Sequence, residues 1–480
     1  MKKEKMKTKT KIKQLKLGIA AIVCIIAISA MAAPAAADYS GDHPLTVYEH
    51  GAINGGLVYE TVTDGSKYLK LYSPPPEVAP KPVLSQDLTI TIPDCAEVKT
   101  ARLYNYYTWS DSGYKYVLGD PAEAILTISD GVNTWTTDVN NTVPNPEVAH
   151  YVDRKGSGSW DYPSGTFAWD VTDYVTAGGT YTATIENAKD LTYSGTYWDP
   201  YDPGEYFCTY GFGLLIVYEM DEGPDVEYWI GEGCDMLYAS PYYGTTPEMA
   251  TTQAAFANPA FELEDIASAD LTAVVSASDK GSWIPPKNIV LFNDVELDPS
   301  TAVSNRAIGV NSFDVLDLLS EEQNIAEIQD RGDYEAARNA FLVVESPVPA
   351  NVTIEPETLN LNSNGQWVTA YIELPVCLNC GVADINASTV YLNGTVPAVT
   401  DPQYGFVTDP DSYLVDHDGD GIPERMVKFD RADVITYLGT IDFEGETGSD
   451  KMVELTVTGE LFDGTAFEGC DTVRVITPVE

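Results

Sequence analysis

The chain has 480 residues, of which 44% are hydrophobic and 11% aromatic, so it is long enough for about three domains and apolar enough to bury their cores. Its formal net charge is −46. A field of that sign repels nucleic acid and anionic lipid, which excludes nucleic-acid binding, and it favours solubility and the attraction of divalent cations.

The N-terminus has the three parts of a secretory signal. The first sixteen residues include eight lysines, an apolar run covers residues 17–30, and Ala35, Ala36 and Ala37 precede Asp38. We expect residues 1–37 to be removed on export; the alternative is an uncleaved anchor helix, because the apolar run is long. We therefore expect an exported protein, extracellular or at the cell surface, with no transmembrane anchor after signal cleavage.

Strand-like runs dominate the chain after the signal, for example over residues 88–93, 101–109, 124–128 and 213–218. Gly, Pro, Asn and Asp separate these runs at short intervals, which is typical of all-β sandwiches. The fold class predicted from this pattern is all-β.

An internal repeat divides this region. Residues 169–175 (WDVTDYV) and 313–319 (FDVLDLL) carry the same phrase, 144 residues apart, and residues 126–132 similarly match 289–295. Each phrase is followed by a turn and two strands, which predicts tandem β-sandwich units at 38–220 and 221–347. Residues 315–338 also have some helical periodicity, but the repeat predicts that they are mostly not helix.

The repeated aromatic-Asp-Val-x-Asp phrase resembles galactose-binding-like jelly rolls, in which its first aspartate would cap a turn. The wider segment 41–346 resembles an uncharacterised family, a domain of unknown function, of exported cell-surface proteins of methanogenic archaea. The phrases that carry this resemblance are VKTARLYNYY at 98–107 and DRGD at 330–333. The resemblance implies an archaeal cell-surface protein but no particular chemistry.

Residues 348–480 are predicted to form a third, immunoglobulin-like β-sandwich. This segment is similar to a small β module that is repeated in secreted bacterial and archaeal proteins and commonly carries an Asp-rich loop. The resemblance implies a surface or adhesion-like context.

The loop DHDGDGIPE at 416–424 has the oxygen spacing of a calcium site. Its expected ligands are Asp416, Asp418, Asp420, the carbonyl of Ile422, and Glu424, with Gly421 making the turn. Val427 stands where an EF-hand has its bidentate glutamate, so Asp411, Asp430 or water would complete the set. Calcium is the expected cofactor; the alternative is a solvated acidic turn.

Six cysteines remain after the signal, and their spacing leaves the disulfide pairing open. They are Cys95, Cys208, Cys234, Cys377, Cys380 and Cys470. An alternative use of Cys377 and Cys380 is a zinc site completed by Cys470 and His417. The sequons at Asn140, Asn351, Asn386 and Asn393 are candidate glycosylation sites on an exported surface.

No catalytic motif is present: the sequence has four histidines and no nucleophile elbow, HExxH or phosphate-binding glycine loop. Acidic residues are so frequent that no pair marks a glycosidase site. Aromatic clusters offer candidate sugar-stacking rings, with ordinary core packing as the alternative. The candidates are Tyr106, Trp109, Trp160, Tyr197 and Trp198.

We therefore expect a non-enzymatic, exported cell-envelope protein with a structural, adhesion or glycan-binding role, braced by calcium. Its expected partners are cell-envelope components or glycans. The alternative is a carbohydrate-active enzyme (a glycosidase) or its carbohydrate-binding subunit.

Overall fold

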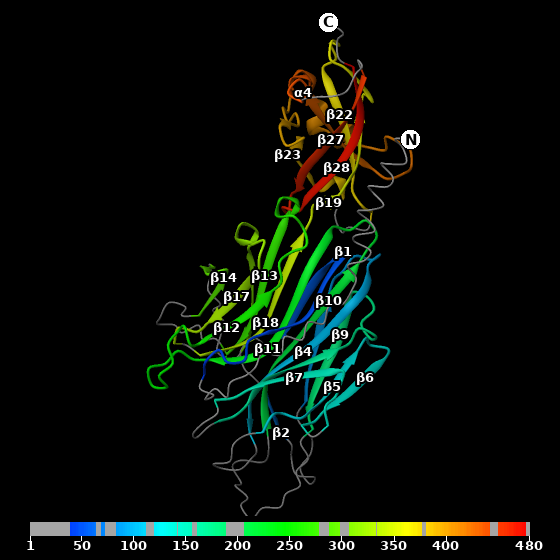
Figure 1. Ribbon diagram of the computed structural model, residues 1–480. Helices are drawn as coiled ribbons and strands as arrows, with labels where there is room; N and C mark the ends of the chain where they lie inside the picture. The colour runs from blue at the N-terminus through cyan, green and yellow to red at the C-terminus, as the bar shows by residue number, and fades with distance from the viewer. Residues whose placement is uncertain are drawn as a thin grey trace, which may run out of the picture. The chain divides into compact units, whose positions relative to one another are not determined.

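The all-β prediction is confirmed: in a computed structural model, antiparallel sheets make up most of the chain (Figure 1). The structure describes residues 39–63, 69–72, 83–111, 120–141, 143–155, 161–188, 206–277, 288–297, 307–332, 334–376, 381–441 and 450–476. The chain folds into two compact units. Unit 1 is Met1–Glu219 with Val226–Glu345, and unit 2 is Met220–Asp225 with Ser346–Glu480. The expected signal, residues 1–37, lies outside the described residues.

The first half of unit 1 is a sandwich of two antiparallel sheets. Its described strands are β1 (Thr46–Thr63), β2 (Leu69–Tyr72), β3 (Val83–Ile90), β4 (Glu97–Asp111), β5 (Ala124–Ser129), β6 (Thr134–Val139), β7 (Val148–Asp153), β8 (Ser164–Asp170), β9 (Gly179–Asn187) and β10 (Tyr206–Glu219). One sheet has the order β1-β10-β4-β8-β7 with β2 beside β10, and the other has the order β3-β9-β5-β6. Alternating apolar residues of both sheets share one core.

The second half of unit 1 is also a two-sheet sandwich. Its described elements are β11 (Asp225–Leu237), β12 (Thr251–Phe256), η1 (Leu263–Asp265), β13 (Ser268–Ser276), β14 (Ile289–Phe292), β15 (Val295–Glu296), β16 (Ile308–Asp314), η2 (Leu316–Leu318), β17 (Asn324–Gln329) and β18 (Glu335–Glu345). The sheet orders are β11-β18-β13-β16 and β12-β17-β14-β15.

The two halves repeat the same topology. The order β1-β10-β4-β8 matches β11-β18-β13-β16, and β3-β9-β5-β6 matches β12-β17-β14-β15. The repeated phrase makes the same turn twice: Asp170 Oδ1 accepts from the Thr172 amide at 3.1 Å, and Asp314 Oδ1 accepts from the Leu316 amide at 3.0 Å. Residues 315–338 form a 3₁₀ turn and two strands, as the repeat predicts, and contain no long helix among their described members.

The two halves share one large sheet, because β1 lies beside β11 in the order β16-β13-β18-β11-β1-β10-β4-β8-β7. The separate sandwiches expected at 38–220 and 221–347 thus lie within one compact unit. The three-domain division of the chain stays a prediction.

A buried ion pair joins the halves across this sheet. The Arg102 guanidinium on β4 donates from Nε to Glu232 Oε1 at 2.9 Å and from Nη2 to Oε2 at 2.8 Å, and the two side chains are 2% and 0% exposed. The Tyr104 and Tyr151 hydroxyls donate to the same carboxylate at 2.8 and 3.0 Å. Burial opposes the charge of Arg102, but the Glu232 carboxylate outweighs it and raises the pKa of the guanidinium.

A second buried arginine extends from the second half into the first. Arg338 on β18 donates from Nη1 to the Gly165 carbonyl at 2.9 Å and from Nη2 to the Tyr107 carbonyl at 3.0 Å, both in the first half. Its Nε donates to Ser276 Oγ at 2.8 Å. Each half therefore places one arginine in polar sites of the other.

Unit 2 is a third sandwich. Its described elements are β19 (Val348–Pro349), β20 (Asn351–Glu355), β21 (Thr358–Asn360), β22 (Trp367–Glu373), η3 (Val382–Asp384), β23 (Ile385–Leu392), β24 (Val396–Pro397), α2 (Gly405–Thr408), α3 (Pro410–Tyr413), β25 (Leu414–Val415), β26 (Glu424–Asp430), α4 (Arg431–Leu438), β27 (Asp450–Leu461) and β28 (Ala466–Ile476). The sheets run β19-β28-β27-β23-β24, with β21 beside β28, and β20-β22-β26-β25, around a common core. Within the described part of the chain, every helix is too short or too polar to cross a bilayer.

The repeat makes a first prediction. Trp169 and Phe313 occupy matching core positions and are 1% and 6% exposed. Replacing either by alanine should lower the free energy of unfolding by about 3–5 kcal/mol, because a large ring is removed from a packed core. Val132→Ala, at a side chain that is 89% exposed, should change it by less than about 0.5 kcal/mol. Denaturant unfolding measures both; a small effect at Trp169 or Phe313 contradicts the equivalence.

The buried ion pair at the junction of the two halves leads to a second prediction. Glu232→Gln should cost about 3–5 kcal/mol, because it leaves the Arg102 guanidinium buried without a counter-charge. The double variant Arg102→Met/Glu232→Gln removes that charge and should be more stable than Glu232→Gln alone. Glu219→Gln, which disrupts the exposed pair with Lys99, should cost less than about 1 kcal/mol. Additive losses in the double variant would show that the pair is not coupled.

Candidate functional site

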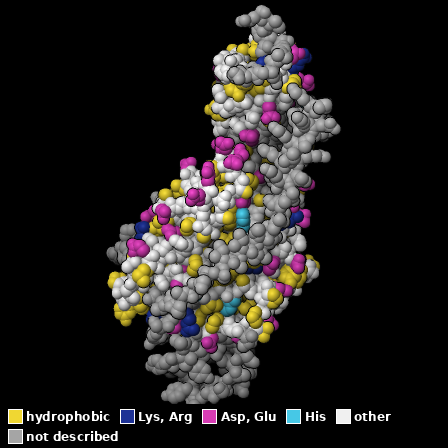
Figure 2. Space-filling model, in the orientation of Figure 1, with side chains coloured by type: hydrophobic (Ala, Val, Ile, Leu, Met, Phe, Trp, Pro, Cys, Tyr) yellow, Lys and Arg dark blue, Asp and Glu magenta, His cyan; other side chains and the backbone are white. Residues whose placement is uncertain are grey.

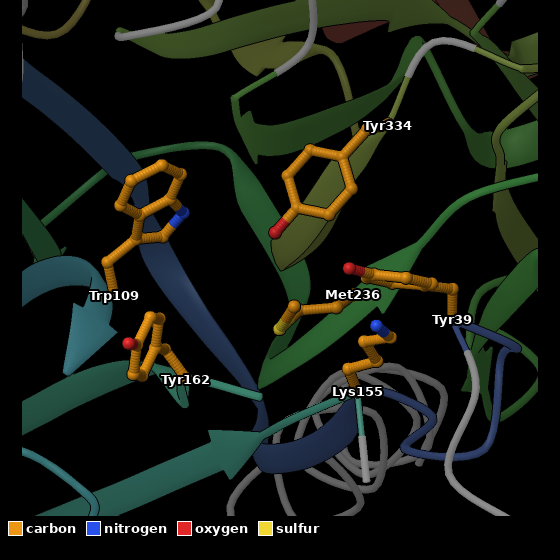
Figure 3. A pocket seen from close by; sticks show the side chains of 6 residues that line it. All are labelled: Tyr39, Trp109, Lys155, Tyr162, Met236 and Tyr334. Atoms are coloured by element: carbon orange, nitrogen blue, oxygen red, sulfur yellow. The ribbon is translucent and has the colours of Figure 1, made fainter. Parts of the chain in front are cut away.

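A pocket of about 340 Å³ opens where the two halves of unit 1 meet (Figure 3). The described residues that line it are Tyr39, Trp109, Lys155, Tyr162, Met236 and Tyr334. The first half supplies Trp109, Lys155 and Tyr162, and the second half supplies Met236 and Tyr334. Such a site, with aromatic walls and few polar groups, is typical of small-molecule pockets.

The backbone of β4 turns Trp109 into this pocket. Its φ is +53°, a left-handed conformation that is costly for a bulky residue. The pairing of β4 with β10 shifts register here, between Cys208↔Thr108 and Tyr206↔Asp111. A β-bulge of this kind changes the direction in which a nearby side chain points, here that of Trp109. Trp109 is 47% exposed.

A cluster of tyrosines supports the opposite wall. The Tyr39 ring lies edge-on to Tyr238, Tyr243 and Tyr334, with centroids 5.7, 5.1 and 5.7 Å apart. Burial and then the neighbouring Tyr243 raise the pKa of Tyr39 to about 12, so its hydroxyl stays neutral. Lys155 Nζ lies 5.0 Å from the Tyr243 centroid, within cation–π range. The wall thus offers apolar faces, a neutral hydroxyl and one positive charge.

The sequence-predicted stacking residues have different outcomes. The prediction is wrong for Tyr106, which is 0% exposed because its hydroxyl donates to Asn339 Oδ1 at 2.7 Å inside the junction. Trp109 does line the pocket. The other three candidates lie outside the described residues: Trp160, Tyr197 and Trp198. The rings that accompany Trp109 come from distant parts of the chain: Tyr162 belongs to an aromatic cluster of the sequence with Trp160, whereas Tyr39 and Tyr334 carry no local signal.

The acidic loop of unit 2 is a hairpin connection. It is closed by the pair Val415↔Glu424 of β25 and β26, and Gly419 and Gly421 have φ of +80° and +94°, which favour glycine. The carboxylates of Asp416, Asp418 and Asp420 each accept a loop amide, from Gly419 at 2.8 Å, Asp420 at 3.1 Å and Ile422 at 2.7 Å. These local bonds set the loop's shape.

Carboxylates converge on this loop in two overlapping groups. One oxygen each of Asp416, Asp418 and Asp420 lie within 4.8 Å of one another, and so do oxygens of Glu373, Asp418 and Glu424. Glu373, the last residue of β22, was not predicted. Burial, followed by the charges of Asp420, Asp418 and Glu424, raises the pKa of Glu373.

The two residues proposed from sequence to complete the ligand set are not in these groups. Asp430 instead caps α4, where its Oδ1 accepts from the Ala432 amide at 2.8 Å, and Asp411 lies in α3. Glu373, at the end of the strand β22 that pairs with β26, joins Asp418 and Glu424 in the second group instead. The role of the Ile422 carbonyl stays a prediction.

The alternative zinc site stays a prediction, because two of its four expected ligands lie outside the described residues. The His417 ring stacks on Tyr371 with centroids 3.6 Å apart, and neither it nor Cys470 belongs to a metal-capable group among the described residues. Cys377 and Cys380 lie outside the described part. Cys95 is disulfide-bonded, whereas Cys208, Cys234 and Cys470 are not. Burial raises the pKa of the Cys234 thiol to about 12.

The candidate glycosylation residues are accessible. Asn140 and Asn351 are exposed, and Asn386 and Asn393 are partly exposed. None is buried, so each sequon is compatible with a glycan; the modification itself stays a prediction.

Solved structures give only weak likenesses. N-glycanase F (PNGase F) matches with a TM-score of 0.20 and 10% identity, over 60% of this chain and 96% of that one. The glycoside hydrolase domain of Endo-D from Streptococcus pneumoniae R6 matches with a TM-score of 0.12 and 12% identity, over 52% of this chain and 32% of that one. PcdhgB3 EC1-4 matches with a TM-score of 0.14 and 10% identity, over 88% and 91%. At these scores the likenesses carry no argument.

No curated protein matches the sequence. A family model described as "Protein of unknown function (DUF3344)" matches residues 38–345. That range covers nearly all of unit 1, including both repeated halves and the pocket between them. The chain belongs to the DUF3344 family.

Proposed function

We propose that this protein is a non-enzymatic, exported protein of an archaeal cell envelope that binds glycans in the pocket of unit 1. The observation that carries the proposal is the pocket itself, where Trp109 presents an exposed ring opposite a tyrosine wall and Lys155. Sugars stack their C–H faces on aromatic rings while their hydroxyls meet polar groups. The pocket supplies both kinds of surface.

Binding fits this pocket better than hydrolysis does. Among the described residues that line it, Lys155 is the only charged side chain; the nearby carboxylates of Asp42, Asp153 and Asp235 gather around His43 outside the lining. Glycoside hydrolysis needs two carboxyl groups flanking the scissile bond. A carbohydrate-binding subunit of an enzyme, part of the alternative raised by the sequence, shares this binding role; a glycosidase does not.

The surface charge suits an exported location. Figure 2 shows acidic side chains scattered over the visible face, with few basic ones among them. Such a surface keeps a protein soluble and draws divalent cations. We propose that calcium binds the acidic loop of unit 2, where Glu373, Asp416, Asp418, Asp420 and Glu424 hold negative charge close together.

Glycan binding gives a third prediction. Trp109→Ala should weaken binding to the preferred glycan by about 10-fold, the equivalent of about 1.4 kcal/mol, because one stacking face is lost. Trp109→Phe should retain part of the affinity. Phe462→Ala, at an exposed ring of unit 2, is the matched control and should bind normally.

The measurement is a glycan array on the mature protein with and without calcium, followed by calorimetry on the strongest hit. Absence of binding to every glycan, or equal binding by Trp109→Ala, contradicts the proposal. Release of sugar from a bound glycan would favour the glycosidase.

Calcium binding gives a fourth prediction. With a dissociation constant of about 10⁻⁴–10⁻³ M, 10 mM calcium should stabilise unit 2 by about 1.4–2.7 kcal/mol by mass action. Scanning calorimetry of the full chain should then show a higher melting temperature for the transition of unit 2. Asp418→Ala should abolish the rise, and Glu373→Gln should reduce it.

Asp411→Asn is the matched control for Glu373→Gln, because it removes an acid that lies outside the converging groups. It should leave the calcium effect intact. Melting curves that are indifferent to calcium and to chelator would mean that the loop is only a solvated acidic turn.

A further inference from the structure

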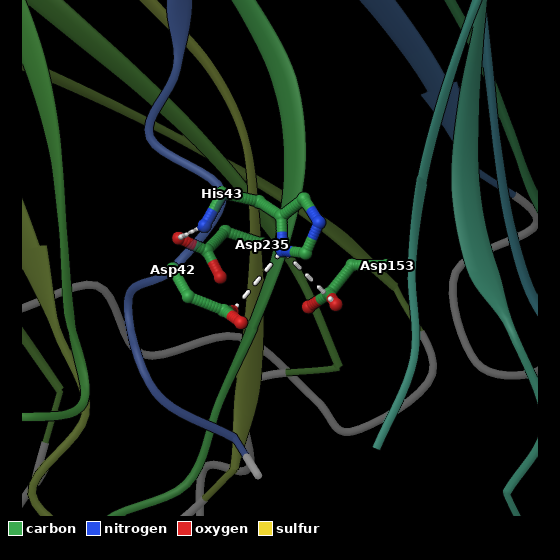
Figure 4. A group of neighbouring side chains, drawn as sticks. All are labelled: Asp42, His43, Asp153 and Asp235. Atoms are coloured by element: carbon green, nitrogen blue, oxygen red, sulfur yellow. Dashed lines mark hydrogen bonds and ion pairs between the residues drawn. The ribbon is translucent and has the colours of Figure 1, made fainter. Parts of the chain in front are cut away.

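A second group of acidic side chains lies in unit 1, close to the pocket (Figure 4). It consists of Asp42 and His43 from the segment before β1, Asp153 at the end of β7, and Asp235 on β11. Sequence analysis did not identify it, because the four residues come from three separate segments. The sheet topology brings these segments together at the junction of the two halves.

The donor atoms of this group converge. His43 Nδ1 lies 3.1 Å from Asp42 Oδ1 and 3.3 Å from Asp153 Oδ1. The His43 backbone amide donates to Asp235 Oδ2 at 3.3 Å. One donor atom from each of the four side chains lies within 4.8 Å of the others, which is compact enough for one ion to reach all four.

One atom of the group lacks the partner that its burial requires. Asp235 is 0% exposed, and its Oδ1 accepts no hydrogen bond. The neighbouring Thr252 hydroxyl interacts with this carboxylate, but its geometry does not make a hydrogen bond of normal length and angle to Oδ1. Figure 4 shows Asp235 Oδ1 directed toward the space that the Asp42 and Asp153 carboxylates face. A buried carboxylate oxygen without a donor is costly unless a positive charge reaches it.

The protein's own charges do not balance this group. Three carboxylates face one imidazole, so a negative charge remains even when His43 is protonated.

We propose that Asp42, His43, Asp153 and Asp235 form a binding site for a divalent transition cation such as Mn²⁺ or Zn²⁺. Three carboxylates and one imidazole make a mixed oxygen and nitrogen donor set, which suits these ions; calcium prefers oxygen donors alone. The ion would reach Asp235 Oδ1 and neutralise the excess negative charge.

Such an ion would fix the walls of the pocket. Tyr39 precedes Asp42 by three residues, Lys155 follows Asp153 by two, and Met236 follows Asp235 directly. One ion would therefore tie the N-terminal segment to both halves and hold these three lining residues in place. The metal site does not depend on what the pocket binds.

The test is calorimetric titration of MnCl₂ and ZnCl₂ into the full, tag-free chain after treatment with chelator. The background carries Asp418→Asn/Asp420→Asn, which silences the acidic loop of unit 2. We expect one ion per chain in this background. Asp235→Asn, which is isosteric, and His43→Gln, at a side chain that is 48% exposed, should each weaken the affinity at least 10-fold. Glu264→Gln, at an exposed acid of unit 1, is the control and should bind normally.

Absence of stoichiometric binding in the background would overturn the proposal. So would affinities unchanged by Asp235→Asn or His43→Gln, or calcium binding that is as tight as manganese binding and indifferent to His43→Gln. Thermal melting of the same variants without metal separates loss of the site from loss of the fold. Glycan binding is not part of the readout, so failure here leaves the proposed function standing.

Discussion

The arrangement of unit 1 depends on the buried ion pair between Arg102 and Glu232. Each charge costs several kcal/mol to bury alone, so the two halves can pack only in a position that brings guanidinium and carboxylate together. A shift of register between β1 and β11 would break the backbone ladder and also separate this fork-to-fork contact, so the ion pair reinforces one register. Arg338, which donates to two carbonyls of the first half, adds the same constraint from the other side.

The two repeated halves share the same backbone features at the place where they meet but differ there in their side chains. Positions that match between β4 and β13 differ by 168 residues, so Trp109 corresponds to Ala277, and both have a left-handed backbone, with φ of +53° and +66°. The bulges of β10 and β18 also match, and they leave Tyr210 and Arg338 at equivalent places. The left-handed residue and the bulge therefore occur in both halves, whereas the side chains that fill the junction and the pocket differ between the halves.

Local patterns in the sequence predict most of the strands and the repeat, because alternating apolar residues and turn residues act within a few positions. The calcium spacing of Asp416, Asp418 and Asp420 is likewise local, and the loop folds as a hairpin. Glu373 could not be found this way, since only the pairing of β22 with β26 brings it to the loop. Tyr106 was misassigned for the same reason: an aromatic ring looks alike in sequence whether the junction buries it or not.

The acidic residues of this chain are accommodated in several different ways. The chain has 73 acidic residues against 27 lysines and arginines, so most acids find no basic partner and remain in solvent. Buried carboxylates are satisfied in different ways: Arg102 meets Glu232 and Arg154 meets Asp161 at 3.2 Å, His50 meets Glu227, and Asp330 accepts the backbone amides of Ala239 and Gly332. The acidic loop of unit 2 and the group around Asp235 gather carboxylates with no lysine or arginine among their described ion-pair partners. The like charges repel one another at both places; His43 offsets part of this repulsion around Asp235, and a bound cation would offset more of it at each site.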